Sequence, residues 1–350
     1  MPCDPPRILF CFYPLHVHYN HGVALLSQLC RDRGITTRLE MLESRDRFRT
    51  VLAEYNPDWV CFSAVIERDY TASLPYLRLA NNWGFLTMLG GVYPRRVGIP
   101  PDCPADLVCQ GEGETLPDFL LHGDDRLFTE KLVWPNLDTL PLPDYALFQE
   151  IPFDRELPFL KDEGGRLKDE KGFSVILPYY TSRGCPWPCT FCEVRTQTGI
   201  VRYRRNVGED LAHLARTYQP ELFMIGDETL PYWDREWRAS WGEFRYPFVA
   251  YLRGDTPTEA VEWLQDRGLI GCAFGVECGD EQYRNEFLRK ELRDADLFRF
   301  VADLERLGIP FAPFYLQGLP GESFRQQTKT AQMVQRIGGH SVIFQYEPLF

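Results

Sequence analysis

The stretch that decides the fold reads Thr181-Ser-Arg-Gly-Cys-Pro-Trp-Pro-Cys-Thr-Phe-Cys192. Three thiolates on one short loop can bind three irons of a four-iron cluster and leave the fourth iron open. The glycine and the two prolines keep this loop out of a helix, so the sulfurs can surround one cluster. A zinc knuckle or three unrelated thiols is the alternative, but no further Cys or His follows closely enough to complete a zinc site. The spacing therefore predicts an iron–sulfur site with the ligands Cys185, Cys189 and Cys192.

The Cys-x3-Cys-x2-Cys spacing, with Phe191 before the last cysteine, resembles the radical S-adenosylmethionine (SAM) superfamily. The resemblance implies a 4Fe-4S cluster whose open iron is chelated by the amino and carboxylate groups of SAM. Electron transfer into the sulfonium then releases a 5′-deoxyadenosyl radical. A reductant protein such as a flavodoxin or a ferredoxin is the implied partner.

The length and composition of the chain narrow the class of protein. At 350 residues the chain suits two domains, and its 44% hydrophobic and 14% aromatic content supports packed cores. A net charge of −12 argues against a nucleic-acid-binding surface. The N-terminus has no secretory signal pattern and no apolar run reaches membrane-spanning length, so we expect no membrane partner and a reducing cytoplasm.

The first part of the chain alternates strand and helix signals. Five strands joined by crossover helices predict a Rossmann-like, doubly wound five-stranded parallel sheet over residues 1–131. Ligands of such sheets bind beyond the carboxyl ends of the strands. The expected strands are Arg7–Tyr13, Thr36–Glu40, Trp59–Ser63, Phe85–Leu89 and Asp106–Cys109, and the expected helices are Gly22–Arg33, Phe48–Tyr55, Tyr70–Asn82 and Glu114–Leu121.

Residues 132–172 are rich in proline and carry a charged turn, which predicts a connector between two domains. Strand and helix signals resume over residues 173–350. Six such units are too few for a closed eight-stranded barrel and suit the partial (β/α)6 TIM-type barrel that the radical SAM family uses. In α/β barrels the chemistry gathers at the carboxyl ends of the strands. The expected strands are Val175–Tyr180, Leu222–Ile225, Phe248–Leu252, Ala273–Val276, Phe311–Leu316 and Val342–Phe344, and the expected helices are Glu209–Thr217, Thr258–Asp266, Asp294–Leu307 and Ser323–Ile337.

Several strand ends match positions that bind SAM in the family. Gly226, Asp227 and Glu228 occupy the place of a motif that binds the amino group, and Phe191 would lie beside the adenine. A helix cap is the alternative for Asp227. Glu277 matches the carboxylate that accepts hydrogen bonds from both ribose hydroxyls, with an ion pair to a nearby Arg as the alternative. The remaining candidates are Arg253, Arg289 and Lys290 for the SAM carboxylate, and Gln317 and Gly318 for the adenine region.

The first domain resembles the cobalamin-binding domain that is fused to many radical SAM enzymes. The resemblance implies that small residues leave room for the nucleotide tail of a corrinoid. The family's Asp-x-His-x-x-Gly motif is missing: counting back from Gly22, Tyr19 stands at the histidine position, so no histidine ligand to cobalt is expected from the motif. The candidate cobalamin residues are Tyr19, Ser63, Val65, Gly90, Gly91 and Glu112.

Together the two resemblances predict a cobalamin-dependent radical SAM methyltransferase of class B. Cobalamin would carry a methyl group from one SAM, and a second SAM would yield the radical that activates a carbon of a small-molecule or peptide natural product. One alternative keeps the radical chemistry but has a degenerate first domain, and catalyses cyclisation or rearrangement without corrinoid. A tRNA methylthiotransferase fits less well, because it needs an auxiliary cluster and a basic RNA-binding tail. A non-enzymatic iron–sulfur scaffold or sensor has no use for the SAM motifs.

Overall fold

A computed structural model describes residues 5–13, 20–124, 135–148, 176–192 and 201–346. The chain divides into two compact units. The first comprises Met1–Pro152 with Phe350, and the second comprises Phe153–Leu349. The cores are described below unit by unit.

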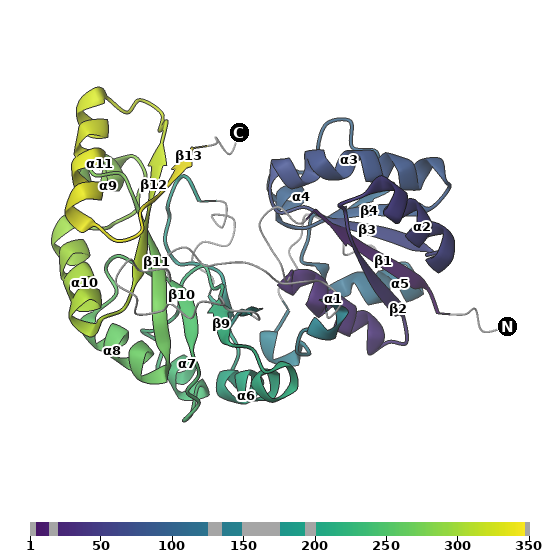
Figure 1. Ribbon diagram of the computed structural model, residues 1–350, viewed down its shortest axis with the longest axis horizontal. Helices are drawn as coiled ribbons and strands as arrows, with labels where there is room; N and C mark the ends of the chain where they lie inside the picture. Colours follow the sequence, from purple (N-terminus) through teal and green to yellow (C-terminus); the bar gives the residue numbers. More distant parts are fainter. Residues whose placement is uncertain (1–4, 14–19, 125–134, 149–175, 193–200, 347–350) are drawn as a thin grey trace. The chain divides into compact units, whose positions relative to one another are not determined.

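The first unit contains a five-stranded parallel sheet in the order β2-β1-β3-β4-β5 (Figure 1). Helices lie on both faces of this sheet, so the expected doubly wound arrangement is confirmed. The order reverses between β1 and β3, and ligands of open α/β sheets bind beyond such a switch point. The strands are β1 (Arg7–Phe12), β2 (Thr36–Met41), β3 (Trp59–Ser63), β4 (Leu86–Gly90) and β5 (Leu107–Val108).

The helices of the first unit agree with the predicted ones except at one place. A helix that was not predicted, α4 (Val92–Val97), follows β4. Pro94 concealed this helix in the sequence, although proline is tolerated in a first helical turn because the N–H that it lacks has no intrahelical partner there. The other helices are α1 (His21–Arg31), α2 (Arg45–Tyr55), α3 (Glu67–Asn82) and α5 (Leu116–His122).

The described part of the predicted connector, residues 135–148, packs on the first unit. Leu137 and Leu140 form a buried cluster with Leu25 of α1. Asp144 accepts a hydrogen bond from Arg31 at 2.8 Å and buries its carboxylate. This stretch holds two short 3-10 helices, Leu137–Thr139 and Tyr145–Phe148. The rest of the connector lies outside the described residues, and the boundaries at 131/132 and 172/173 stay predictions.

The second unit contains a six-stranded parallel sheet in the order β13-β12-β11-β10-β9-β6, the expected half-barrel. Neighbours in the sheet follow one another in the chain, because each strand is joined to the next by a right-handed crossover. A two-stranded antiparallel pair, β7 (Ser182–Arg183) with β8 (Arg202–Tyr203), escaped prediction because each strand has only two residues. The long strands are β6 (Ile176–Tyr179), β9 (Leu222–Ile225), β10 (Phe248–Arg253), β11 (Leu269–Glu277), β12 (Phe311–Gln317) and β13 (Val342–Gln345).

Helices cover one face of the second sheet (Figure 1). Phe300 of α10 meets Phe274 of β11 edge to face, which places these rings in the core between sheet and helix. Two helices, α7 (Arg235–Ser240) and α9 (Glu281–Glu286), were not predicted, since six residues are too few to show a helical period. The other helices are α6 (Val207–Tyr218), α8 (Thr258–Arg267), α10 (Asp294–Leu307) and α11 (Phe324–Ile337).

Candidate functional site

The cysteine loop follows β7 and is tied to two separate parts of the second unit. At its start, the backbone N–H of Gly184 donates to Glu228 at 3.2 Å. Near its end, Thr190 donates through its backbone N–H to the Leu288 carbonyl at 2.9 Å and through its hydroxyl to the Phe287 carbonyl at 3.0 Å. The loop is therefore anchored to the residue after β9 and to the segment that follows α9.

Cys185 and Cys189 are thiols on this loop that form no disulfide, and the charges around Cys189 suit a cluster ligand. Burial raises the pKa of the Cys189 thiol, while the nearby charges of Lys290 and Arg253 act in the opposite direction and favour the thiolate. Among the described residues, no three His, Cys, Asp or Glu side chains are grouped so that they hold a single metal ion. A four-iron cluster requires a wider spacing, because each thiolate binds a different iron. The assignment of Cys185, Cys189 and Cys192 as ligands stays a prediction.

Asp227 lies directly after β9, and its side chain supports the entrance to the cysteine loop. The buried carboxylate accepts hydrogen bonds from the Thr181 backbone N–H at 2.7 Å, the Thr181 hydroxyl at 2.5 Å and the Ser182 hydroxyl at 2.6 Å. Burial raises the pKa of Asp227 to about 7, although these three donors oppose the shift. The Asp227 side chain is thus neither a helix cap nor a free ligand, and the role of residues 226–228 toward the amino group of SAM stays a prediction.

Glu277 ends β11 in a left-handed conformation with φ +68° and forms a buried ion pair with Lys290 at 2.8 Å. The pair lies over Gly275, where an added Cβ would stand 1.9 Å from the Glu277 carboxylate and 2.7 Å from the Lys290 ammonium. Gly275 therefore provides the space that the two charges occupy. The predicted alternative, an ion pair with an arginine, is replaced by a pair with the lysine thirteen residues further along the chain.

Arg253, at the carboxyl end of β10, interacts with several groups of the protein itself. Its guanidinium pairs with Asp255 at 2.9 Å and donates to the backbone carbonyls of Lys290 at 2.8 Å and Glu291 at 3.2 Å. The same group stacks on the indole of Trp187 in the cysteine loop, 3.8 Å from the ring centroid. Arg253 thus joins the cysteine loop to the segment after α9, and its role as a ligand of the SAM carboxylate stays a prediction.

An apolar cluster of buried side chains, Cys278, Tyr283, Leu288 and Leu319, lies beside the predicted SAM residue Phe191. Phe191 packs against this cluster, and the Lys290 ammonium lies 5.6 Å from the centroid of its ring. Gln317, at the end of β12, donates to Gln345 at 3.1 Å. Gly318 has φ +79°, and a Cβ there would meet the Gln345 amide at 2.4 Å, so the turn requires glycine.

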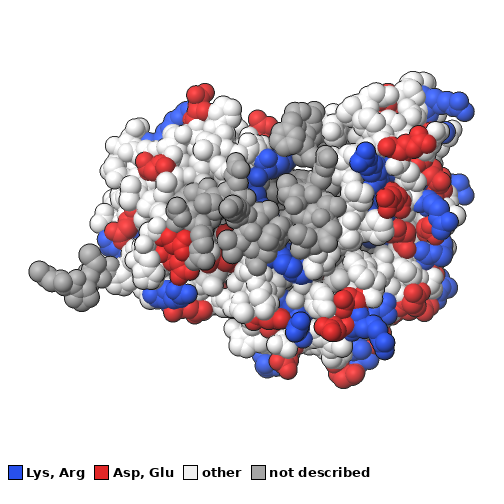
Figure 2. All heavy atoms as spheres, turned by 180° about the vertical axis from the view of Figure 1, so that it is seen from behind, with Lys and Arg blue, Asp and Glu red and all other residues white. Residues whose placement is uncertain are grey.

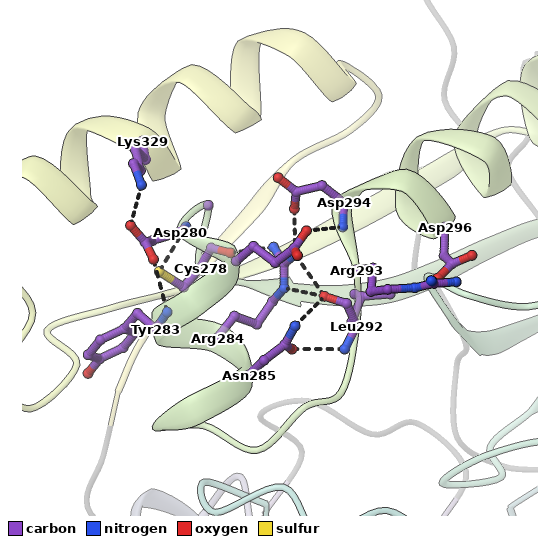
Figure 3. A network of polar contacts seen from close by, with 12 residues as sticks. Cys278, Asp280, Tyr283, Arg284, Asn285, Leu292, Arg293, Asp294, Asp296 and Lys329 are labelled. Carbon is purple, nitrogen blue, oxygen red and sulfur yellow. Dashed lines mark hydrogen bonds and ion pairs between the residues drawn. The ribbon is translucent and has the colours of Figure 1, made fainter.

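Arg284 is fully buried, and Figure 3 shows its contacts. The sequence did not predict a role for this arginine. Its guanidinium donates to the carbonyl of Cys278 at 2.9 Å and to that of Leu292 at 2.9 Å, and it pairs with Asp294 at 2.5 Å. These contacts close the segment between β11 and α10 into a compact loop that carries Lys290 and the carbonyls bonded to Thr190. The only signal in the sequence was a charged residue on the otherwise short α9, which is a common surface pattern.

The predicted cobalamin residues lie at the carboxyl edge of the first sheet. Ser63 ends β3 opposite Gly90, and its hydroxyl accepts a hydrogen bond from Asn20 at 3.2 Å. At Gly91 φ is +104°, and an added Cβ would lie 2.3 Å from the Ala64 carbonyl oxygen, so only glycine fits. Val65 donates its backbone N–H to Asp69 at 3.1 Å, Glu112 buries its carboxylate 3.9 Å from Arg95, and Tyr19 lies outside the described residues.

Charged side chains of both signs are interspersed on the face shown in Figure 2, where the described residues form no continuous basic surface. In the described part of the chain, every helix is too short or too polar to cross a lipid bilayer.

No protein-family model matches the chain. A solved structure of TsrM, a radical SAM methyltransferase from Kitasatospora setae with its tryptophan substrate and a SAM analogue bound, matches 97% of this chain and 73% of its own length, with a TM-score of 0.69 at 15% identity. The hopanoid C-3 methylase of Methylococcus capsulatus is 26% identical over 87% of this chain and 63% of its own length. In fold the chain is similar to this radical SAM methyltransferase, and in sequence it is distantly similar to the curated methylase.

Two further relatives of this chain bear names of the same kind. An uncharacterized methyltransferase of Pyrococcus horikoshii is 23% identical over 90% of this chain and 73% of its own length. The cytidylyl-2-hydroxyethylphosphonate methyltransferase of Streptomyces wedmorensis is 23% identical over 86% of this chain and 66% of its own length. The chain thus spans between 63% and 73% of the curated relatives that it matches.

Proposed function

We propose that this protein is a class B radical SAM methyltransferase that uses cobalamin and transfers a methyl group to an unactivated carbon of a small-molecule or peptide natural product. The observation that carries the proposal is the extent of the likeness to TsrM, which runs through both units over 97% of the chain. The relatives named above supply the comparison: their names describe transfer or introduction of a methyl group, to substrates as different as a hopanoid and a phosphonate.

The residues at the carboxyl edge of the second sheet suit such a reaction. When bound, the cluster and SAM supply a 5′-deoxyadenosyl radical, and a corrinoid supplies a methyl carrier. Glu277 is held rigidly by Lys290 and keeps one carboxylate oxygen beyond the 2.8 Å contact, which can accept from the ribose hydroxyls. Phe191 presents an apolar ring beside that pair. The cysteine loop is fixed from two sides, so its thiolates need little rearrangement to bind iron.

A reducing cytoplasm and a flavodoxin- or ferredoxin-type reductant belong to this proposal, because the three thiolates must remain unoxidised and the cluster must receive an electron. One second candidate keeps the same radical chemistry without a corrinoid. The observation that favours it is the sequence at the expected cobalt-facing loop, where Tyr19 replaces the motif histidine.

Anaerobic reconstitution tests the proposal. We expect about four irons per chain at the cysteine loop, and loss of iron and of SAM cleavage when Cys185, Cys189 and Cys192 are all replaced by Ala. Refolding with hydroxocobalamin should then give the absorption bands of a bound corrinoid and about one cobalt per chain. A protein that cleaves SAM but takes up no corrinoid would favour the second candidate. Retention of a SAM-responsive cluster in the triple variant would overturn the cluster assignment.

A further inference from the structure

Trp187 lies in the cysteine loop and has a buried hydrogen-bond donor without an acceptor. Its indole Nε1 is inaccessible to solvent and makes no hydrogen bond within the described protein. Buried polar groups in folded proteins are nearly always paired, so an orphaned donor needs an explanation. The position of this donor, two residues after Cys185 and two before Cys189, makes a ligand of that loop the first candidate for its partner.

Trp241 also has an unpaired indole N–H, but its surroundings differ from those of Trp187. Trp241 is packed among the rings of Trp237 and Trp263, whose π faces can accept a weak hydrogen bond. The ring of Trp187 instead stacks on the guanidinium of Arg253, which is a donor and cannot accept. The buried indole N–H of Trp187 therefore needs an acceptor that the described residues do not supply.

The stack also fixes the orientation of the indole. Arg253 is itself held by the Asp255 carboxylate and by two backbone carbonyls, so the cation has little freedom to move away from the ring. Burial raises the pKa of the Cys185 thiol, and the backbone N–H of Trp187 acts in the opposite direction. Trp187 thus has its main-chain N–H near the Cys185 thiol and its indole N–H buried, and both lie in the cysteine loop.

We infer that the indole N–H of Trp187 donates a hydrogen bond to a sulfur of the cluster bound by Cys185, Cys189 and Cys192. The inference rests on the cluster that the proposed function requires, and not on the identity of the methyl acceptor or on the corrinoid. A hydrogen bond to a cluster sulfur stabilises the extra negative charge of the reduced state and raises the reduction potential. Trp187 then helps to set how readily the cluster accepts the electron that it passes to SAM.

The reduction potential of the reconstituted full chain tests this inference. Trp187→Phe keeps a ring that can stack on Arg253 and removes only the N–H, so we expect four irons as before and a shift of the potential to more negative values. The matched control is Trp233→Phe, since Trp233 is 47% exposed and lies outside the cysteine loop; its potential should equal that of the wild type. Equal potentials in the wild type and in Trp187→Phe, with or without SAM, would overturn the inference.

A second measurement needs no folded variant. In wild-type protein grown with 15N-indole tryptophan, pulsed electron paramagnetic resonance of the reduced cluster should show coupling to one indole nitrogen and to one exchangeable proton. Absence of both couplings would overturn the inference, even if Trp187→Phe failed to bind iron. A wild-type chain that holds a cluster and cleaves SAM without these couplings would leave the proposed function intact, so the two failures are distinguishable.

Discussion

The two sheets use glycine at their carboxyl edges for opposite purposes. In the first unit, Gly91 lets one backbone segment approach another, and the Ala64 carbonyl occupies the place of its side chain. In the second unit, Gly275 makes room for the charged ends of Glu277 and Lys290, at the place where the pairing of β11 with β12 shifts register. The first edge is thus a surface shaped by main chain and small residues, whereas the second is a surface of charges held in place by one another.

The largest effect on stability is expected at Gly91, where one backbone segment packs directly against another. Gly91→Ala places a Cβ 2.3 Å from a carbonyl oxygen and forces a conformation that side chains rarely adopt, so we expect a loss of about 3 kcal/mol in the free energy of unfolding. Gly90→Ala is the control, because its Cβ would stand at 3.7 Å from Cys109, an ordinary contact. Urea unfolding measures both. Equal stabilities of the two variants would show that the first edge is not shaped by close backbone packing.

A smaller effect, on binding rather than on folding, is expected at the second edge. Glu277→Gln should weaken SAM binding by about 1–3 kcal/mol, the loss typical of a hydrogen bond to a charged group. Gly275→Ala should weaken it in the same direction with little change in stability, since the added Cβ displaces the ends of two flexible side chains. Isothermal titration with SAM on the reconstituted protein measures both changes.

Glu286→Gln is the matched control for this pair, because Glu286 lies on the exposed side of α9 and should leave SAM affinity unchanged. An unchanged affinity in Glu277→Gln would assign that carboxylate to a structural ion pair with Lys290. A Gly275→Ala protein that unfolds as readily as Gly91→Ala would remove the distinction between the two edges.

The last effect is a pH dependence of stability to which Asp227 of the second unit should contribute. Burial raises the pKa of Asp227 to about 7, so the folded protein binds a proton that the unfolded chain has already lost above about pH 4. The contribution of Asp227 to stability is therefore full below about pH 4 and is lost as the pH rises through about 7. Asp227→Asn should reduce the fall in stability between about pH 5 and about pH 7.5. Parallel pH profiles of the wild type and the variant, measured by thermal unfolding, would contradict this assignment.

Local sequence signals predicted most helices and strands, because the residues that produce each signal lie within a few positions of one another. The helix Asp294–Leu307 was predicted with its observed bounds, since apolar residues recur at helical spacing and Gly308 ends it in a left-handed conformation. Short elements such as β7, β8 and α9 were missed, because two to six residues carry too little periodicity. The cysteine spacing and the strand-end motifs predicted the site residues, and the structure places the SAM candidates of the second unit on adjacent strand ends.

The sequence by itself determined that two α/β units exist, which strands precede which loops, and which side chains stand at the strand ends. Only the tertiary structure decided what those side chains do. Asp227 supports the Thr181–Ser182 turn, Arg253 holds Trp187, and Glu277 pairs with Lys290 because parallel strands bring residues distant in the chain to one edge. Spacing along the chain encodes the period of a helix or strand, but the partner of a buried charge depends on which segments the packed sheet brings within about 3 Å.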